Sequence, residues 1–336
     1  MRTNAIAMDL GSVNTGIYQL GYGVVLFEPS VVALTPDRKK AKAVGVEAKK
    51  LIGMTADAKS VVFPVIEGAV DNERAATMMV ENFLNKITLK KLSARPQIIA
   101  SVPCGLEGVE IDKYRKVFNG AGAYSVEFVE SPVLAAIGIG APITDSSPCF
   151  IIDIGGGTTD IAAVSLDGVI AGVSVNMGGR NIDAMIINHI EDYFNLKIGS
   201  LTAERMKVQI GSLVENDATR TTINGRDIAT GKPRSVSVSA QHIRLPIQAF
   251  FDKVFEIAGM VMAKLPAEVS AEIRKSGVYF AGGTSKVLGL EGYFREKMAM
   301  HATVAEDPEL ACLIGGGMVA GDQNLLKKLK INRNQR

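Results

Sequence analysis

Eight residues near the middle of the chain read Asp153-Ile154-Gly155-Gly156-Gly157-Thr158-Thr159-Asp160, and a plainer copy near the N-terminus reads Asp9-Leu10-Gly11-Ser12-Val13-Asn14-Thr15. An apolar, strand-like run precedes each copy and an apolar residue follows it, so each copy is predicted to form a strand, a tight turn and a second strand. Glycines let the backbone approach an anion closely, and Ser and Thr hydroxyl groups add donors. The aspartate that ends each first strand suits hydrated Mg²⁺, which prefers carboxylate, water and phosphate oxygens. The pair predicts a nucleotide held between two similar halves.

A structural explanation competes with this interpretation, because glycine-rich turns after buried strands are common. The N-terminal copy, taken alone, indicates an ordinary hairpin about as readily as a phosphate site. Two copies in one register, with Thr15 and Thr159 at equivalent places, make chance the poorer explanation.

The composition indicates a globular protein of two or more domains, because 336 residues exceed what one hydrophobic core usually serves. A net charge of +2 gives no support to nucleic-acid binding, which needs a concentrated basic face. The three cysteines have neither disulfide-framework nor zinc-site spacing and fit a reducing cytoplasm. We expect no leader peptide and no membrane-spanning helix, because no apolar segment is long enough.

Strand-like and helical segments alternate along the chain, which favours an α/β fold. Buried strands are predicted at 97–102 and 278–281, and amphipathic helices at 76–87, 182–193 and 245–265, the last beginning near Pro246. Two less periodic regions, 31–64 and 202–238, are predicted to be small inserted subdomains, and Asn224-Gly225 in the second predicts a hairpin turn.

A third glycine cluster, Phe280-Ala281-Gly282-Gly283-Thr284-Ser285, lies between a predicted strand and a helix expected to begin near Lys286. This position predicts backbone N–H groups and a positive helix end beside a ligand. By contrast, Gly315-Gly316-Gly317 lies inside an Ala- and Met-rich helical stretch and is interpreted as close helix packing.

With these pieces in order, the chain resembles the superfamily of sugar kinases, heat-shock chaperones and actin, and within it the bacterial actins of the MreB family. The match is collinear over almost the whole chain. Besides the two hairpins, it rests on Phe27-Glu28-Pro29-Ser30-Val31, Ser101-Val102-Pro103, Ala203-Glu204-Arg205-Met206-Lys207 with Ile210-Gly211, Gly225-Arg226-Asp227 with Thr230-Gly231-Lys232-Pro233, Gly282-Gly283, and Glu306-Asp307-Pro308.

The resemblance implies duplicated ribonuclease-H-like domains that flank a nucleotide cleft, each with a small inserted subdomain. The implied boundaries are 1–31, 65–140 and 310–336 for domain IA, 32–64 for subdomain IB, 141–182 and 239–309 for domain IIA, and 183–238 for subdomain IIB.

The same resemblance implies an ATP or ADP site with Mg²⁺. It assigns phosphate contacts to Ser12, Val13, Asn14, Gly155, Gly156 and Gly157, and adenosine contacts to Glu204, Lys207, Gly282, Gly283, Thr284 and Ser285. Asp9 and Asp153 would organise Mg²⁺ through water, and Thr158 would position the attacking water. Without the resemblance, Glu204 and Lys207 would be interpreted as an ordinary i,i+3 ion pair on a helix.

Two departures from the family pattern bear on the chemistry. Relatives usually carry Glu-Glu-Pro, whose second glutamate polarises the attacking water, whereas this chain has Glu130-Ser131-Pro132. Because serine is a poor general base, slow ATP hydrolysis with retained binding is predicted. The alternative is that Glu130 takes over and hydrolysis is ordinary. The second departure is Glu67-Gly68-Ala69-Val70-Asp71, where relatives tend to have Asp-Gly-x-Ile-Ala-Asp.

The resemblance also implies filaments, in the family's form of a double protofilament, on the cytoplasmic face of the cell membrane. It implies a role in cell shape, with cell-wall elongation proteins as candidate partners. Ile87, Leu89 and Leu92, with the lysines between them, are the candidate membrane contact; a solvated helix end is the alternative. The basic tail 324–331 is interpreted as a helix packing on its own domain. Two other functions are weighed, a small-molecule kinase and a chaperone-like ATPase, but no acceptor-activating base or peptide-binding domain is found.

Overall fold

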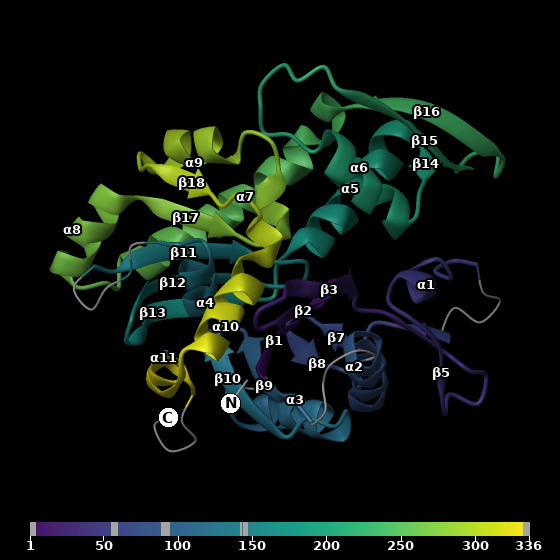
Figure 1. Cartoon of the computed structure of the whole chain (residues 1–336). Helices are drawn as coiled ribbons and strands as arrows, with labels where there is room; N and C mark the ends of the chain where they lie inside the picture. The colour runs from purple at the N-terminus through teal and green to yellow at the C-terminus, as the bar shows by residue number, and fades with distance from the viewer. Residues whose placement is uncertain (1–4, 55–59, 89–94, 142, 144–146, 332–336) are drawn as a thin grey trace.

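The structure, a computed structural model, describes residues 5–54, 60–88, 95–141, 143 and 147–331. Two five-stranded sheets of the same topology form its centre (Figure 1). The first has the order β10 (Ser125–Glu130), β9 (Gln97–Val102), β1 (Ala5–Leu10), β2 (Asn14–Gln19) and β3 (Gly23–Pro29). The second has the order β18 (Ala302–Val304), β17 (Val278–Ala281), β11 (Cys149–Ile154), β12 (Thr159–Ser165) and β13 (Gly168–Val175).

Each sheet joins an antiparallel meander to two parallel strands. In the first, β1 pairs antiparallel with β2 and parallel with β9; in the second, β11 pairs antiparallel with β12 and parallel with β17. Parallel neighbours require crossover connections, which helices supply here. The predicted α/β fold with duplicated halves is therefore confirmed.

The two glycine hairpins have the same register in both sheets. Leu10 pairs with Thr15 in one and Ile154 with Thr159 in the other. Each turn is closed by one backbone hydrogen bond, from the Gly11 N–H to the Asn14 oxygen (3.1 Å) and from the Gly155 N–H to the Thr158 oxygen (2.9 Å). The predicted strand, turn and strand are thus present in both copies.

Helices cover the sheets and join them. The first half contains α2 (Glu73–Thr88), α3 (Gly108–Gly120), α4 (Ser131–Gly138), α10 (Ala311–Gly321) and α11 (Gln323–Leu329). The second contains α5 (Gly179–Phe194), α6 (Ser200–Ile210), α7 (Ala240–Met262), α8 (Ala267–Ser276), α9 (Leu290–Met298) and the short 3₁₀ helices η2 (Gly283–Lys286) and η3 (Pro308–Leu310). One apolar cluster contains residues of both sheets together with α4 and α10, so the halves share a core between them.

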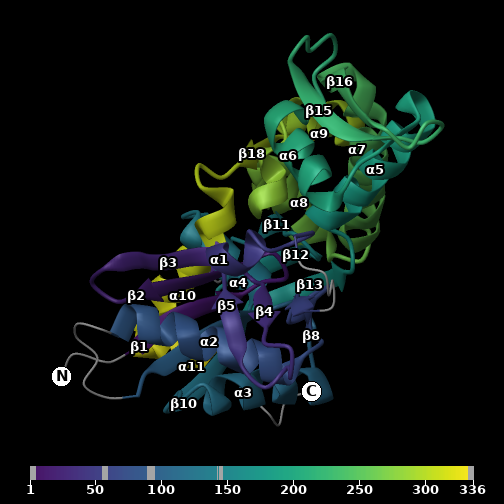
Figure 2. The same ribbon diagram turned by 90° about the vertical axis from the view of Figure 1, so that its right-hand side faces the viewer.

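Two small sheets project from the same side of the molecule, to the right in Figure 1 and facing the viewer in Figure 2. The first consists of β4 (Val32–Leu34), β5 (Ala41–Val44) and β6 (Val61–Val62) with α1 (Val46–Lys49), and a short hairpin of β7 (Val65–Ile66) and β8 (Ala69–Val70) follows it. The second consists of β14 (Leu196–Lys197), β15 (Arg220–Asp227) and β16 (Pro233–Ser239). The domain boundaries given above stay predictions, and the one between 182 and 183 falls inside α5.

Three local predictions were wrong. Helix α7 begins at Ala240, where Ser239 and His242 cap it, so Pro246 lies inside the helix and not in its first turn. The turn between β15 and β16 does not contain Asn224-Gly225, because β15 runs through both residues and Gly225 packs tightly against Leu196. Gly231 at φ 70° supplies the turn instead.

The third error concerns the glycine cluster at 282–285, which leads into the 3₁₀ helix η2, whereas α9 begins only at Leu290. The C-terminal prediction holds: α11 buries Leu326 and Leu329 against its own domain, and Lys330 pairs with Glu127 (3.2 Å).

Close helix packing at Gly315 confirms the interpretation of the third glycine run. A Cβ added to Gly315 would collide with the Leu134 carbonyl oxygen of α4, and one added to Gly138 would collide with the Ala311 carbonyl oxygen of α10. These two glycines let α4 and α10 approach each other beneath the cleft.

We expect Gly315→Ala to lower the free energy of unfolding by about 1 to 3 kcal/mol, because overpacking forces the two helices apart. Urea unfolding is the measurement. Gly292→Ala in α9 is the matched control, since a Cβ there meets open space, and it should be neutral or stabilising by up to about 1 kcal/mol. Equal stability of the two variants would contradict the packing argument.

Candidate nucleotide site

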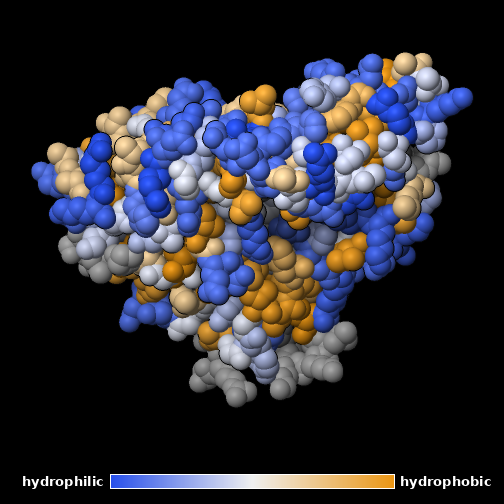
Figure 3. Space-filling model, turned by 90° about the horizontal axis from the view of Figure 1, so that it is seen from above, coloured by the Kyte–Doolittle hydropathy of each residue, from blue (hydrophilic) through white to orange (hydrophobic). Residues whose placement is uncertain are grey.

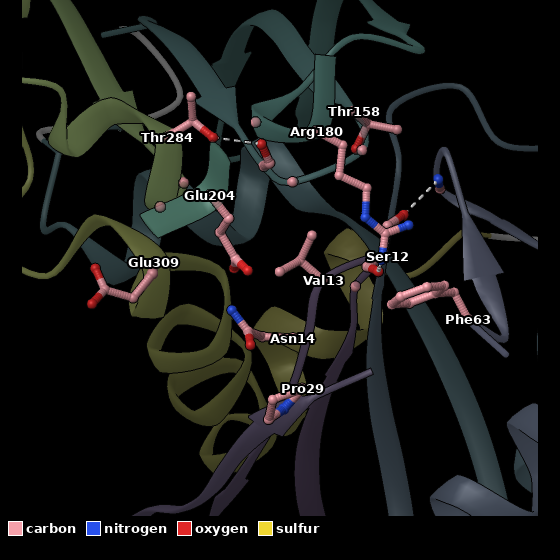
Figure 4. A pocket seen from close by; sticks show the side chains of 18 of the residues that line it. Ser12, Val13, Asn14, Pro29, Phe63, Thr158, Arg180, Glu204, Thr284 and Glu309 are labelled. Atoms are coloured by element: carbon pink, nitrogen blue, oxygen red, sulfur yellow. Dashed lines mark hydrogen bonds between the residues drawn. The ribbon is translucent and has the colours of Figure 1, made fainter. Parts of the chain in front are cut away.

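A cavity of about 520 Å³ lies between the two halves, where the glycine hairpins meet. Its lining comes from both halves and includes Lys49 of α1 in the first insertion and Glu204 and Lys207 of α6 (Figure 4). The contributing loops follow strand ends: β1 and β11 end at the hairpins, and β17 ends at the third glycine cluster. Strand ends of an α/β sheet are the usual place for a ligand site.

The two hairpins touch each other directly. A Cβ added to Gly156 would collide with the Val13 side chain, and one added to Gly157 would lie 2.7 Å from the Ser12 Oγ atom. Any side chain at these two positions would separate the halves. Glycine therefore lets both turns bring backbone N–H groups to the same cavity.

Most of the predicted site residues line this one cavity: Asp9, Ser12, Val13, Asn14, Ser131, Asp153, Gly155, Gly156, Gly157, Thr158, Glu204, Lys207, Gly282, Gly283 and Thr284. Glu130 and Ser285 are not among the residues that line it. Ser285 is buried, and its hydroxyl group donates to the Ala281 carbonyl oxygen (2.5 Å), so it supports the glycine turn from behind.

Glu130 is the other predicted residue that the cavity lining lacks. It is 7% exposed, and its Oε1 atom accepts a hydrogen bond from the Gly105 N–H (2.8 Å). If the Glu130 side chain turned toward the cavity, the Gly105 N–H group would lose this hydrogen-bond acceptor. The structure therefore gives no support to Glu130 as a replacement for the missing glutamate.

Ser131 opens α4 at the floor of the cavity, with Pro132 in the first turn of the helix. The Ser131 hydroxyl group donates to the Val102 carbonyl oxygen (3.0 Å). The hydroxyl proton is therefore used in this hydrogen bond, and only the lone pairs of the Ser131 oxygen remain for a further hydrogen bond. Such a hydroxyl group can accept a hydrogen bond from water but cannot take up a proton at neutral pH.

The Glu67-Gly68 turn between β7 and β8 closes the cavity near Thr158. Both residues have positive φ angles, 49° and 71°. The Gly68 N–H donates to the Ser12 Oγ atom (3.1 Å), and the Tyr114 hydroxyl group donates to the Gly68 carbonyl oxygen (3.0 Å). The departure from the family pattern at 67–71 thus forms a turn that contacts the first phosphate hairpin.

Glu204 and Lys207 do not pair with each other, so the simple i,i+3 interpretation fails. Glu204 pairs with Lys49 across the cleft (2.9 Å), and Lys207 pairs with Asp183 of α5 (2.8 Å). The Lys207 Nζ atom also donates to the Gly179 carbonyl oxygen (2.8 Å). α6 therefore presents one carboxylate and one ammonium group to the cavity.

Three buried carboxyl groups, Asp9, Asp153 and Asp160, line the deep end of the cavity. Burial raises the pKa of Asp9, although the Ser101 hydroxyl group donates to it (2.7 Å). Burial raises the pKa of Asp153 to about 6, assisted by the Asp9 charge and opposed by the hydrogen bond from Cys312. Burial and the Asp153 charge raise the pKa of Asp160 to about 7. This cluster of carboxyl groups favours a bound cation.

The donor set fits a hydrated magnesium ion. Mg²⁺ accepts carboxylate oxygens and retains several waters, so one carboxylate from each half, Asp9 of β1 and Asp153 of β11, can hold it together with phosphate oxygens. Among the described residues, no group of three or more His, Cys, Asp or Glu side chains forms a metal cage. Asp9 and Asp153 would thus hold the ion mainly through water.

Comparison with known proteins identifies the family. A family model described as MreB/Mbl protein matches residues 3–328. The chain belongs to this family. The cell shape-determining protein MreB of Escherichia coli (strain K12) is 34% identical over 323 residues, which cover 94% of this chain and 93% of that protein. The cell shape-determining protein Mbl of Bacillus subtilis (strain 168) is 32% identical over 328 residues, which cover 97% and 98%.

Solved structures show the same actin-like fold. MreB5 of Spiroplasma citri bound to AMPPNP matches with a TM-score of 0.89 and 28% identity, over 96% of each chain. The same protein bound to ADP matches with the same TM-score. A MamK double helical filament structure matches with a TM-score of 0.79 and 21% identity over 95% of this chain and 99% of that one, which is evidence for the fold alone.

Several residues at the cavity of this MreB/Mbl chain were missed by the sequence analysis. Asp160 ends the quoted hairpin and Arg180 follows Gly178-Gly179, so both had a local signal that went unused. Lys49 and Phe63 come from the first insertion and Cys312 from α10, where nothing in the sequence indicates a ligand. They reach the cavity only through the packing of the two halves.

The raised carboxyl pKa values predict that stability falls as pH rises. The pKa values of Asp153 and Asp160 are higher in the folded chain than the ordinary aspartate pKa of 3.8, so the folded state binds protons more tightly than the unfolded state. This contribution to stability is present below about pH 4 and is lost as the pH rises to about 7. Without divalent cations, the free energy of unfolding should drop by roughly 2 to 4 kcal/mol from pH 5 to pH 8.

Urea unfolding at the two pH values measures this drop. Asp160→Asn should reduce it, whereas Asp192→Asn, at an exposed position of α5, should not. An unchanged drop in the Asp160 variant would show that this carboxyl group is not its source.

Proposed function

We propose that this protein is an actin-like cytoskeletal protein that binds ATP or ADP with Mg²⁺ in the cleft and assembles into filaments. The observation that carries this proposal is the direct contact of two phosphate-type hairpins, one from each half, at a single cavity. A ligand bound there touches both halves, so its phosphate chain can control how they close. The MreB5 structures bound to AMPPNP and ADP support the choice of an adenine nucleotide.

Binding uses this chain's own groups in three places. The turns at Ser12 to Asn14 and Gly155 to Gly157 would hold the phosphates with backbone N–H groups, and Asp9 and Asp153 would hold the ion through water. The adenosine end would lie between α6 and the Gly282 turn, near Glu204 and Lys207. When bound, Mg²⁺ supplies charge neutralisation to the phosphate oxygens.

Filament formation needs a head-to-tail contact that does not close. Apolar side chains are exposed on both halves, including Leu245 and Leu288 of the second (68% and 59% exposed), and apolar groups stand among hydrophilic ones on the face seen from above (Figure 3). The curated relatives are named cell shape-determining proteins, which supports a role in bacterial cell shape, with cell-wall elongation proteins as candidate partners.

We further propose that the filaments lie on the cytoplasmic face of the cell membrane. Leu89 and Leu92 of the candidate membrane contact lie outside the described residues. Ile87 lies in the last turn of α2, is partly buried and packs against the apolar core of the first half. Within the described ranges, no helix is long and apolar enough to cross a bilayer. Co-flotation with anionic vesicles tests the contact.

The nucleotide-dependent assembly is tested with Mg-ATP, by sedimentation and negative-stain electron microscopy. We expect filaments with Mg-ATP and few without nucleotide, because closure of the two halves forms the contact surface. Gly156→Ala should abolish ATP-dependent assembly, since its methyl group collides with Val13 and forces the hairpins apart. Equal assembly of this variant, with its circular dichroism unchanged, would contradict the proposal.

We predict that ATP hydrolysis is slow, because Ser131 stands where relatives carry a glutamate and its proton is engaged by Val102. Ser131→Glu should raise the rate of phosphate release about 100-fold, the lower end of what a general base contributes. Ser131→Ala should hydrolyse as slowly as the wild type. A wild-type rate equal to that of the glutamate variant would remove the argument.

A further inference from the structure

We propose that Arg180 is a positioning residue that connects the two glycine hairpins and holds the cleft closed. We further infer that its guanidinium charge is available to a bound phosphate group. The inference rests on the proposed nucleotide binding and names a residue of that site. Arg180 is the second residue of α5, which belongs to the second half, and its side chain extends across the cavity to the first half (Figure 4).

The backbone of Arg180 is fixed to the second hairpin. Its N–H group donates to the Gly156 carbonyl oxygen (2.9 Å), and the N–H group of Gly179 donates to the Gly155 carbonyl oxygen (3.0 Å). A Cβ added to Gly178 would lie 2.6 Å from the Gly156 carbonyl carbon, so the start of α5 packs directly against the turn. The position of Arg180 is therefore set by the same residues that are expected to hold phosphate.

The side chain of Arg180 is fixed to the first hairpin. Its Nη2 atom donates to the Ser12 carbonyl oxygen (2.6 Å), and its guanidinium carbon lies 4.5 Å from the centre of the Phe63 ring. Figure 4 shows the guanidinium group between Ser12 and the face of that ring. One residue thus bonds Gly156 through its backbone and Ser12 through its side chain, one in each hairpin.

The charge of Arg180 differs from that of the other cations at the cavity. Lys49 and Lys207 line it as well, and both pair with carboxylates, Glu204 and Asp183. Within the described part of the chain, no ion pair includes Arg180, whose bonded partner is a neutral carbonyl group. Burial lowers its pKa, opposed by the charges of Glu204 and Asp183, but an arginine stays cationic at neutral pH.

A guanidinium group beside a phosphate-type turn favours binding of a carboxylate or a phosphate group, whose oxygens accept its N–H groups. A phosphate chain between the hairpins would gain this charge and would find both turns already aligned. Loss of the side chain removes both effects. The half-buried Lys49–Glu204 pair also crosses the cleft, but its charges neutralise each other, so Arg180 is expected to dominate phosphate binding.

The inference is tested by calorimetric binding of ATP, ADP and adenosine to the full chain with Mg²⁺. Arg180→Met keeps an apolar side chain against Phe63 and removes the charge and the hydrogen bond. We expect its affinity for ATP and ADP to fall about 10-fold or more, since hydrogen bonds of charged groups are worth about 1.5 to 3 kcal/mol. Adenosine, which lacks phosphate, should bind about equally to both. Arg180→Lys should recover part of the loss.

The matched control is Arg295→Met, which removes an exposed arginine of α9 away from the cavity and should bind all three ligands like the wild type. Equal ATP and ADP affinity of Arg180→Met and wild type would overturn the inference. A loss of adenosine binding as large as the loss of ATP binding would overturn it too, since it would indicate a merely structural role.

Domain closure gives a second readout that needs no nucleotide. Small-angle scattering should show a larger radius of gyration for Arg180→Met than for the wild type. An unchanged radius would contradict the role of Arg180 in holding the two halves together. If the wild type binds no adenine nucleotide, the proposed function fails, but this measurement still decides whether Arg180 holds the cleft closed. Should Arg180→Met not fold, Phe63→Leu removes the stacking face and should weaken ATP binding in the same direction; an unchanged affinity would count against the inference.

Discussion

The contact between two glycine turns sets the arrangement of this molecule. Gly156 and Val13 approach so closely that a Cβ at position 156 would lie 2.1 Å from the Val13 side chain, and one at Gly157 would lie 2.7 Å from the Ser12 Oγ atom. Backbone N–H groups of both turns can serve one anion only at such a distance. The shared core of α4 and α10 supports the contact from below, where Gly138 and Gly315 permit a second close approach. Glycine is required in both layers for the same steric reason.

Charge is distributed unevenly around the cavity. Carboxyl groups gather at one end, where burial raises the pKa values of Asp153 and Asp160, whereas the cations come from α1, α5 and α6. Lys49 and Lys207 are already paired with carboxylates, which leaves the charge of Arg180 for an anion. In the proposed complex, a magnesium ion beside the carboxyl groups and a phosphate chain beside Arg180 would each neutralise charge.

Binding and hydrolysis make different demands on this chain. The phosphate turns depend on glycines and backbone N–H groups, all of which are present. Hydrolysis also depends on a group that orients and activates water, and the expected glutamate is replaced by Ser131, whose proton is engaged by Val102. Glu130 next to it bonds the Gly105 N–H and does not line the cavity. The proposal of retained nucleotide control with slow turnover rests on this separation.

The sequence alone determined the fold class and the duplicated hairpins, because strand periodicity and glycine turns are local properties. The family resemblance brought most of the predicted site residues, though not most of the lining, to the cavity. The sequence also indicated close packing at Gly315 to Gly317, where Gly315 meets α4, whereas Gly316 and Gly317 meet Ala7 of β1 and Tyr18 of β2. It misplaced the β15–β16 turn, since Asn224-Gly225 carries a turn signal that pairing with Ser235 and Arg234 of β16 overrides. Only the tertiary structure decided that Glu204 pairs with Lys49 and not with Lys207, and that Arg180 reaches Ser12. These contacts join residues of different halves, and side-chain partners across a cleft depend on how two domains pack, which no local pattern contains.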